Sequence, residues 1–383
     1  MEGFMQKDKL VPDVRFKGFE EEWKTNRLCE VALKFDNLRI PVSESLRIKG
    51  PYPYYGANGV QDYVSGFTHN GEFVLIAEDG ANDLDSYPSN YVNGKFWANN
   101  HVHVLQGFKD TLDNKFLNYS FANVNFKPLL TGGDRAKLTA SALDTINIKV
   151  PIFNEQRKIG SLLNNIDQLL LFQKSKLEKL QIIKQSLLNK MFTSYEKKMP
   201  EIRFKGFNED WNTDKVCNLF KITRGEVLAQ NQISEFQNEI YAYPVYSSQT
   251  LKNGLMGYYK EYLFDNCVTW TTDGANAGTV KYRNEKFYCT NVCGVLEEGK
   301  LKPNDCFAEL LNLVTPNHVT RAGNPKLMNS TMGEIIINYP NSTIEYTKIS
   351  TLFMSIDSLI HSCDQKLEKL NNIKKALLEK MFC

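Results

Sequence analysis

The chain has 383 residues, of which 42% are hydrophobic and 12% aromatic, so it can form the cores of two or three domains. Its formal net charge of +2 excludes a strongly basic protein that holds nucleic acid through overall charge alone. No segment has the roughly eighteen consecutive apolar residues of a membrane span, and the N-terminus lacks the apolar run of a signal peptide. We therefore expect a cytoplasmic protein with no membrane contact.

The first recognisable segment is a signature, PDVRFKGFEEEW, that runs from Pro12 to Trp23. It returns as PEIRFKGFNEDW, from Pro200 to Trp211, so the chain contains two copies of one unit. The first copy also spells the PD…ExK string of many nucleases, whose carboxylates hold a metal. We reject a nuclease site because the string is short and the second copy has Asn212 where the lysine would be.

After each signature, short or alternating apolar runs separated by Gly, Asn and Pro predict a strand-rich domain. Two kinds of polar loop recur in both domains. The segment from Tyr52 to Gly59 corresponds to that from Tyr243 to Thr250, and EDGAN at 78–82 corresponds to TDGAN at 272–276. Amide and hydroxyl groups in such loops can bond to base edges, although each residue can equally be an ordinary turn residue. The candidate recognition residues in or beside these loops are Asn58, Gln61, Asn82, Ser248, Gln249 and Asn276.

Basic residues recur near the end of each domain. Lys137 and Lys326 occupy matched places directly before a leucine, with Arg135 and Arg321 nearby. Such side chains can contact phosphates or guanine, and an ion-pair role is the alternative for all four. We predict that they belong to a nucleic-acid-binding surface.

The longest predicted element is a heptad helix from Lys158 to Phe192, repeated from Lys348 to Phe382. Its apolar residues follow a 4-3 spacing and form one narrow stripe, interrupted in each copy by a lysine, Lys184 or Lys374. At about 1.5 Å per residue each helix is roughly 50 Å long. Two such stripes can cover each other, although two core helices of separate domains are the simpler alternative. Because a link of only about seven residues joins the units, we expect antiparallel pairing.

The predicted order is therefore a domain over residues 1–154, a helix and link over 155–199, a domain over 200–344 and a helix over 345–383. We predict no catalytic residue, no metal site and no cofactor in this chain. It contains no GxxxxGK[ST] loop, no NPPY-like string and no glycine-rich loop for S-adenosylmethionine. His101 and His103 lack the company of metal ligands, and Cys289 and Cys293 lack a second pair, so neither group predicts a metal site.

The tandem RFKGF…W units, the segment PIFNEQRKI from Pro151 to Ile159, and the KLEKL…KMF helices together resemble the DNA-specificity subunit of Type I restriction–modification systems. The resemblance covers nearly the whole chain. The second copy departs from the family pattern at PNSTIEYTKI, from Pro340 to Ile349, where the first copy has EQRKI.

This resemblance implies an α/β (α+β) fold with two tandem strand-rich target-recognition domains, each followed by a long helix, and an antiparallel coiled coil of the two helices. Each domain would read one half of a bipartite site in double-stranded DNA. The helices would set the spacer and dock two methylation subunits. S-adenosylmethionine, ATP and Mg would belong to those subunits and to the restriction and translocation subunits, and this chain would not be an enzyme. The alternative is a protein-interaction scaffold with two ligand-binding domains and no DNA contact.

Overall fold

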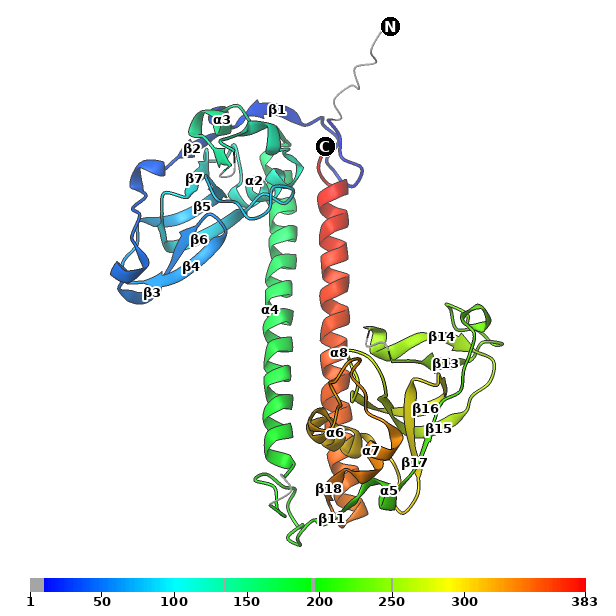
Figure 1. Cartoon of the computed structure of the whole chain (residues 1–383). Coiled ribbons are helices and arrows are strands. Elements are labelled where there is room, and N and C mark those ends of the chain that lie inside the picture. Colours follow the sequence, from blue (N-terminus) through cyan, green and yellow to red (C-terminus); the bar gives the residue numbers. More distant parts are fainter. Residues whose placement is uncertain (1–9, 134–135, 194–196, 249–250) are drawn as a thin grey trace. The chain divides into compact units, whose positions relative to one another are not determined.

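The computed structural model describes residues 10–133, 136–193, 197–248 and 251–383. The chain divides into two compact units (Figure 1). Unit 1 comprises Met1–Lys174 and Gln365–Cys383, and unit 2 comprises Ser175–Asp364. Each unit therefore contains one strand-rich domain and portions of both long helices, α4 (Phe153–Met191) and α8 (Thr343–Lys380). The domain boundaries expected from the sequence stay a prediction.

Unit 1 is built on a six-stranded sheet with the order β2-β7-β5-β6-β3-β4. Neighbouring strands are antiparallel except for β3 and β6, which are parallel. A second, two-stranded sheet pairs β1 with β10, and a third pairs β8 with β9. The strands are β1 (Lys24–Arg27), β2 (Ala32–Lys34), β3 (Lys49–Gly56), β4 (Gly59–Val64), β5 (His69–Ala77), β6 (Ser89–Ala98), β7 (Val102–Gly107), β8 (Leu130–Thr131), β9 (Lys137–Leu138) and β10 (Asn147–Val150). The short helices are α1 (Leu28–Val31), α2 (Asn114–Ser120) and α3 (Ala140–Asp144).

Unit 2 repeats this design with the strand order β12-β17-β15-β16-β13-β14, and β13 and β16 are again the parallel pair. β11 pairs with β18 as β1 pairs with β10. The strands are β11 (Asn212–Lys215), β12 (Phe220–Arg224), β13 (Tyr243–Tyr246), β14 (Leu255–Tyr259), β15 (Phe264–Thr271), β16 (Val280–Cys289), β17 (Cys293–Glu298) and β18 (Ile336–Tyr339). The short helices are α5 (Val216–Leu219), α6 (Asp305–Val314) and α7 (Asn329–Glu334). The duplication predicted from the sequence thus extends to the sheet topology.

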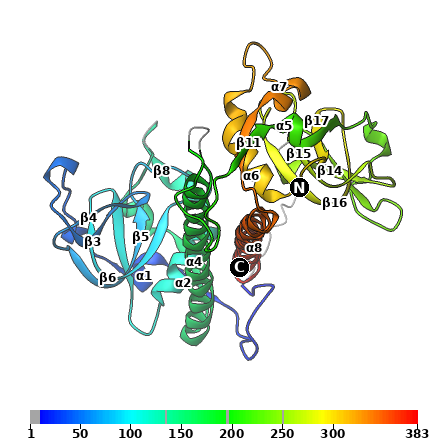
Figure 2. The same cartoon turned by 90° about the horizontal axis from the view of Figure 1, so that it is seen from below.

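One helix of each domain packs between the sheet and a long helix. In unit 1 this is α2, which lies beside α4 in Figure 2. Its Phe116 and Leu117 share a buried cluster with residues of β5 and with Ile159 of α4. In unit 2 it is α6, whose Phe307 shares a cluster with β15 and with Phe353 of α8. Apolar burial at these two interfaces fixes each domain to the start of the long helix that follows it.

The RFKGF signatures contact the first turn of the long helix in their own unit. The Arg15 guanidinium donates two hydrogen bonds, of 2.7 and 2.8 Å, to the carboxylate of Glu155, which is 0% exposed. Arg203 and Glu345 form the same pair, at 2.6 and 2.8 Å. A helix lysine also lies over a signature phenylalanine in each copy, Lys158 over Phe19 and Lys348 over Phe207. The two helix starts therefore make matching contacts although PNSTIEYTKI departs from PIFNEQRKI.

The KMF ends of the long helices complete the cores of the units in which they finish. Phe382 of unit 1 lies 6.0 Å from Trp23 and 5.3 Å from Phe116 between ring centroids. Phe192 of unit 2 lies 6.2 Å from Trp211 and 5.7 Å from Phe353. Each repeated KMF end thus packs against the tryptophan of a signature, which lies far away in sequence for Phe382 and directly after the link for Phe192.

Within each unit the two long helices run in opposite directions. In unit 1, Ile159 near the start of α4 shares a core cluster with Phe382, after the end of α8, and Asp167 pairs with Lys374 at 2.6 Å. In unit 2 Lys184 pairs with Asp357 at 2.6 Å, while the end of α4 shares a core with the start of α8. The two lysines that interrupt the predicted stripes are therefore matched ion-pair partners between helices, and the predicted antiparallel pairing is confirmed.

The predicted stripes are the covered faces of both helices. The stripe residues are buried at each end and half-buried between the ends, as for Ile159, Leu163, Leu177, Leu180 and Met191 of α4. The helices begin about five residues earlier than the heptad pattern indicates, at Phe153 and Thr343. Of the helices in the described residues, none is both long and apolar enough to cross a membrane.

Three carboxylates, those of Asp305, Glu309 and Asp357, lie close together around Lys184 in unit 2. Burial, followed by the charges of Glu309 and Asp357, raises the pKa of Asp305 to about 7 from 3.8. Between these two values the folded state binds a proton that the unfolded state has lost, so folding should weaken as pH rises. We expect the free energy of unfolding of the wild type, relative to Asp305→Asn, to fall between about pH 4 and 7 by at most about 1.4 kcal/mol per pH unit and then to level off. Denaturant unfolding of both chains from pH 4 to 8 tests this, and parallel curves would contradict it.

Candidate nucleic-acid interface

Three elements of unit 1 meet at the EDGAN turn that follows β5. The backbone N–H of Leu138 in β9 donates to the carbonyl of Glu78 at 2.7 Å. The Asn58 side chain, in the β3–β4 turn, donates to the Gly80 carbonyl at 3.0 Å and accepts from the Asn82 backbone N–H at 2.9 Å. The structure thus brings three predicted residues together: Asn58, Asn82 and, in β9, Lys137. The Asn58 amide already bonds to the neighbouring turn, which is the structural alternative considered above.

Unit 2 builds the same junction at its TDGAN turn. Leu327 N–H donates to the Thr272 carbonyl at 2.9 Å, and Gly274 N–H donates to the Pro325 carbonyl at 3.0 Å. These bonds place Lys326 beside the turn that carries Asn276, whose side chain is exposed. The matched positions of the lysines in the sequence therefore correspond to matched positions in space.

The other predicted residues are less closely grouped. Gln61 is exposed in β4, and its side chain covers Gly56, where a Cβ atom would lie 2.2 Å from the Gln61 amide nitrogen. Ser248 is half-buried after β13, and Arg321 is exposed. Arg135 and Gln249 lie outside the described residues.

Lys137 and Lys326 each pair with an acidic residue of the adjoining turn. The Lys137 Nζ lies 2.7 Å from Glu78, and the Lys326 Nζ lies 3.5 Å from Asp273. About half of each lysine side chain remains exposed, 47% and 50%. The ion-pair role is therefore the one seen in the structure, and contact with nucleic acid stays a prediction for all the candidate residues.

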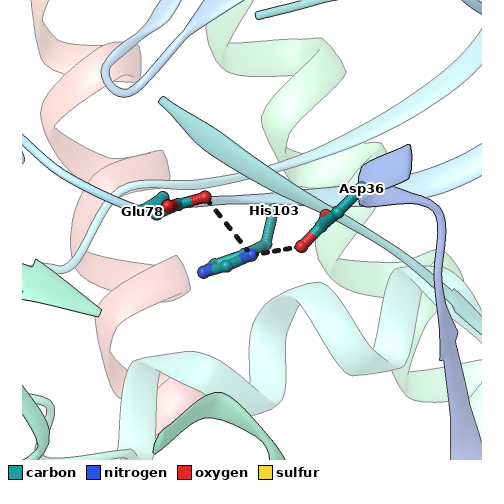
Figure 3. A group of neighbouring side chains, drawn as sticks. All are labelled: Asp36, Glu78 and His103. Carbon is teal, nitrogen blue, oxygen red and sulfur yellow. Dashed lines mark hydrogen bonds and ion pairs between the residues drawn. The ribbon is translucent and has the colours of Figure 1, made fainter. Parts of the chain in front are cut away.

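Glu78, the partner of Lys137, belongs to a charged network with His103 and Asp36 in unit 1 (Figure 3). His103 is 1% exposed, and its Nδ1 lies 2.6 Å from Asp36 and 3.7 Å from Glu78, while its Nε2 bonds to the Leu138 carbonyl at 2.8 Å. Burial alone would raise the pKa of Glu78, but hydrogen bonds from Lys137 and Arg39 outweigh burial and lower it. The network connects the lysine to the turn after β5 through Glu78, and through it to His103 of β7, so its position is fixed by the fold.

Two groups of side chains have the composition of cation ligands. The ligand atoms of Asp36, Glu78 and His103 lie within 4.8 Å of one another, as do those of the carboxylates around Lys184. A basic side chain already pairs with each group: Arg39 lies 2.5 Å from Glu78, and Lys184 lies 2.6 Å from Glu309. We therefore interpret both groups as ion-pair networks that stabilise the units.

Sequence reasoning missed Lys281 and Arg283 of β16, which line a polar cavity in unit 2. Neither residue belongs to a repeated motif, so the comparison of the two copies gave no signal for them. Their alternate spacing in a strand places them on one face of the sheet, which a period of two could have indicated.

Comparison with known proteins identifies a matching family. The family model of the Type I restriction modification DNA specificity domain matches residues 20–181 and 208–372. A putative type I restriction enzyme specificity subunit of Haemophilus influenzae is 48% identical over 165 residues, which are 43% of this chain and 42% of that protein. An N-terminal specificity-subunit sequence of Mycoplasma pneumoniae is 41% identical over 143 residues, which are 37% of this chain and 74% of that protein.

A solved structure, the Type I restriction–modification system S subunit of M. genitalium, shares the fold. It superimposes with a TM-score of 0.78 at 16% identity and covers 97% of this chain and 99% of that one. The predicted fold is thereby confirmed: two strand-rich domains, each with a long helix. Because two copies of the domain model together cover most of the sequence, the chain belongs to the Type I restriction–modification DNA specificity family.

Proposed function

We propose that this chain is the sequence-reading subunit of a Type I restriction–modification complex. Each strand-rich domain reads one half of a bipartite site in double-stranded DNA. The paired helices hold the two domains and so set the spacer between the half-sites. The chain itself performs no chemistry on DNA.

The observation that carries this proposal is the repeated junction of a DGAN turn with an extended, lysine-bearing segment in each unit, β9 in unit 1 and the bridge at Lys326 in unit 2. The two domains have the same fold but different polar residues at that junction. They can therefore take the same orientation relative to the DNA backbone and read two different base sequences. The central parts of the domains have diverged more than the signatures and the helix ends that dock them.

Membership of the specificity family supports a proposal for the partners. We propose that the long helices dock two methylation subunits, and that restriction and translocation subunits join this assembly. S-adenosylmethionine, ATP and Mg bind to those subunits. Weak overall charge in this chain is consistent with a complex in which partner subunits supply much of the contact with phosphates.

An exchange of one domain tests the proposal. Residues 35–126 are replaced in the full chain by the equivalent segment of a relative, and modified adenines are mapped by sequencing DNA from cells that also express the methylation subunits. We expect one half of the methylated motif to change while the other half and the spacer stay the same. A change in both halves or in neither would refute independent reading, and methylation that does not depend on this chain would refute the function.

The two lysines should contact phosphates instead of bases. Lys137→Ala and Lys326→Ala should each weaken binding of the complex to all duplex sequences and reduce the salt slope of log K by about 1. Filter binding at several salt concentrations measures both effects, with the exposed Lys260→Ala as the control. A changed base preference would show that the lysine reads a base. Unchanged binding would show that the lysines do not contact DNA and serve only in their ion pairs with Glu78 and Asp273.

A further inference from the structure

A polar cavity of about 220 Å³ lies against one face of the unit 2 sheet. Its lining includes Thr269 and Thr271 of β15, Lys281 and Arg283 of β16, and Ser247. Thr269 and Lys281 are direct partners in the antiparallel register, so these side chains share one face. Two cations and several hydroxyl groups therefore converge on one space, and the described residues that line it include no carboxylate.

Arg283 lacks the partner that comparable arginines have. Arg15, Arg39 and Arg203 are also partly buried, and each lies 2.5–2.7 Å from a carboxylate oxygen. For Arg283, no carboxylate of the described residues lies within ion-pair distance. Its Nε donates to the Thr269 hydroxyl at 3.2 Å, and its Nη2 donates to the Asn253 carbonyl at 2.9 Å.

The guanidinium of Arg283 is also held in place. It lies 3.7 Å from the centroid of the Tyr246 ring, and burial lowers its pKa. The carboxylate that acts electrostatically on Arg283 is that of Glu285, which accepts a hydrogen bond from the Tyr246 hydroxyl and makes no ion pair with the guanidinium. A partly buried charge without a direct ion-pair partner is unfavourable, so a bound anion would stabilise this arrangement. A fixed guanidinium with neighbouring hydroxyls suits the oxygens of a phosphate, which it can bind through two parallel hydrogen bonds.

In unit 1 the corresponding register positions carry no cationic side chain. The pairs that correspond in register to Thr269–Lys281 and Cys267–Arg283 are Leu75–Asn90 and Phe73–Val92. Phe73, Leu75 and Val92 belong to a buried apolar cluster. Unit 2 therefore has a cationic cavity at a place where the same fold can instead form an apolar core.

We propose that the cavity lined by Arg283 and Lys281 binds an oxyanion, and that its ligand is a phosphate group of the DNA backbone. The assignment of the ligand to DNA rests on the proposed function. The cavity has room for roughly seven water molecules at about 30 Å³ each, which is enough for a phosphate group. Thr271 directly precedes the TDGAN turn and Ser247 directly precedes Ser248, so the walls continue into the segments expected to contact DNA.

The first arm of the test uses inorganic phosphate and the full chain. Thermal unfolding is followed over a phosphate titration with chloride adjusted to constant ionic strength. We expect a saturable rise in Tm for the wild type, its loss in Arg283→Gln and its partial retention in Arg283→Lys. Lys300→Gln, an exposed lysine of unit 2, is the matched control. Equal stabilisation of wild type and Arg283→Gln would overturn the oxyanion site. If Arg283→Gln fails to fold, Lys281→Gln provides the same comparison.

The second arm uses the complex with methylation subunits and a duplex that carries the mapped motif. Arg283→Gln should lower affinity roughly ten- to a hundredfold, as expected for one charged hydrogen-bonded contact, and reduce the salt slope by about 0.9. A motif changed only in the half read by unit 1 should show the same relative loss. If phosphate stabilises the chain but DNA binding is unaffected, the site takes a free oxyanion and its assignment to DNA is wrong. Absence of DNA binding by the wild-type complex would instead refute the proposed function and leave the first arm valid.

Discussion

Phe382→Ala should destabilise unit 1 by about 3–5 kcal/mol, although the substitution lies at the opposite end of the chain from the domain that it affects. Phe382 is 6% exposed and packs against Trp23 and Phe116. Removing its ring leaves a cavity beside two aromatic side chains, so transfer and cavity costs add. Hydrogen–deuterium exchange should show lost protection in β1, α2 and the first turns of α4.

The matched substitutions make this prediction specific. Phe192→Ala should cause an equivalent loss of protection in unit 2, because Phe192 packs against Trp211 and Phe353. Phe172→Ala changes the same type of residue on the exposed face of α4, where the side chain is 63% exposed, and should change the stability by less than about 0.5 kcal/mol. If Phe382→Ala lowered protection in unit 2 and left unit 1 unchanged, the packing of Phe382 against Trp23 and Phe116 would not determine the stability of unit 1.

Arg15→Met should cost about 3–5 kcal/mol because it leaves the Glu155 carboxylate buried without its counter-charge. Glu155 is 0% exposed and receives both of its charged hydrogen bonds from Arg15. The double variant Arg15→Met, Glu155→Gln should recover part of the loss, since the uncompensated charge is gone. Denaturant unfolding of the wild type, both single variants and the double variant gives the coupling energy.

The second copy provides an independent check of this ion pair. Arg203→Met should destabilise unit 2 to a similar degree, because Arg203 and Glu345 have the same geometry. Additive effects of the two Arg15 and Glu155 substitutions would contradict a role for the pair. In that case the signature would act through its apolar residues alone.

Local sequence signals were sufficient for most of the fold. The 4-3 spacing predicted the covered face of the helices because burial at that period is a property of each helix by itself. Repetition of the signature predicted two equivalent units. The contact between Arg15 and Glu155 could not be predicted, because the two residues lie 140 positions apart and an acidic residue in a first helical turn is common for electrostatic reasons.

The candidate site was predictable only in part. Comparison of the two copies located Lys137 and Lys326 at the right junction, but repetition selects residues for structural as well as functional reasons. Their ion pairs to Glu78 and Asp273 illustrate this ambiguity. The positions of Lys281 and Arg283 carry Asn90 and Val92 in unit 1, so repetition gave no signal for these two basic residues.

The exchange of helix ends has a consequence for the order in which the chain folds during synthesis. Unit 2 comprises one continuous stretch, Ser175–Asp364, whereas unit 1 also requires Gln365–Cys383. Of the two units, the one that the ribosome begins first is therefore the one whose core is closed last, because Met381 and Phe382 are translated after all of unit 2. Until then the apolar surface around Trp23 and Phe116 has no cover, contrary to the usual completion of N-terminal domains before C-terminal ones. We expect a chain that is arrested just before residue 365 and then released to contain a folded, protease-resistant unit 2. A protease should cleave unit 1 of the same chain readily.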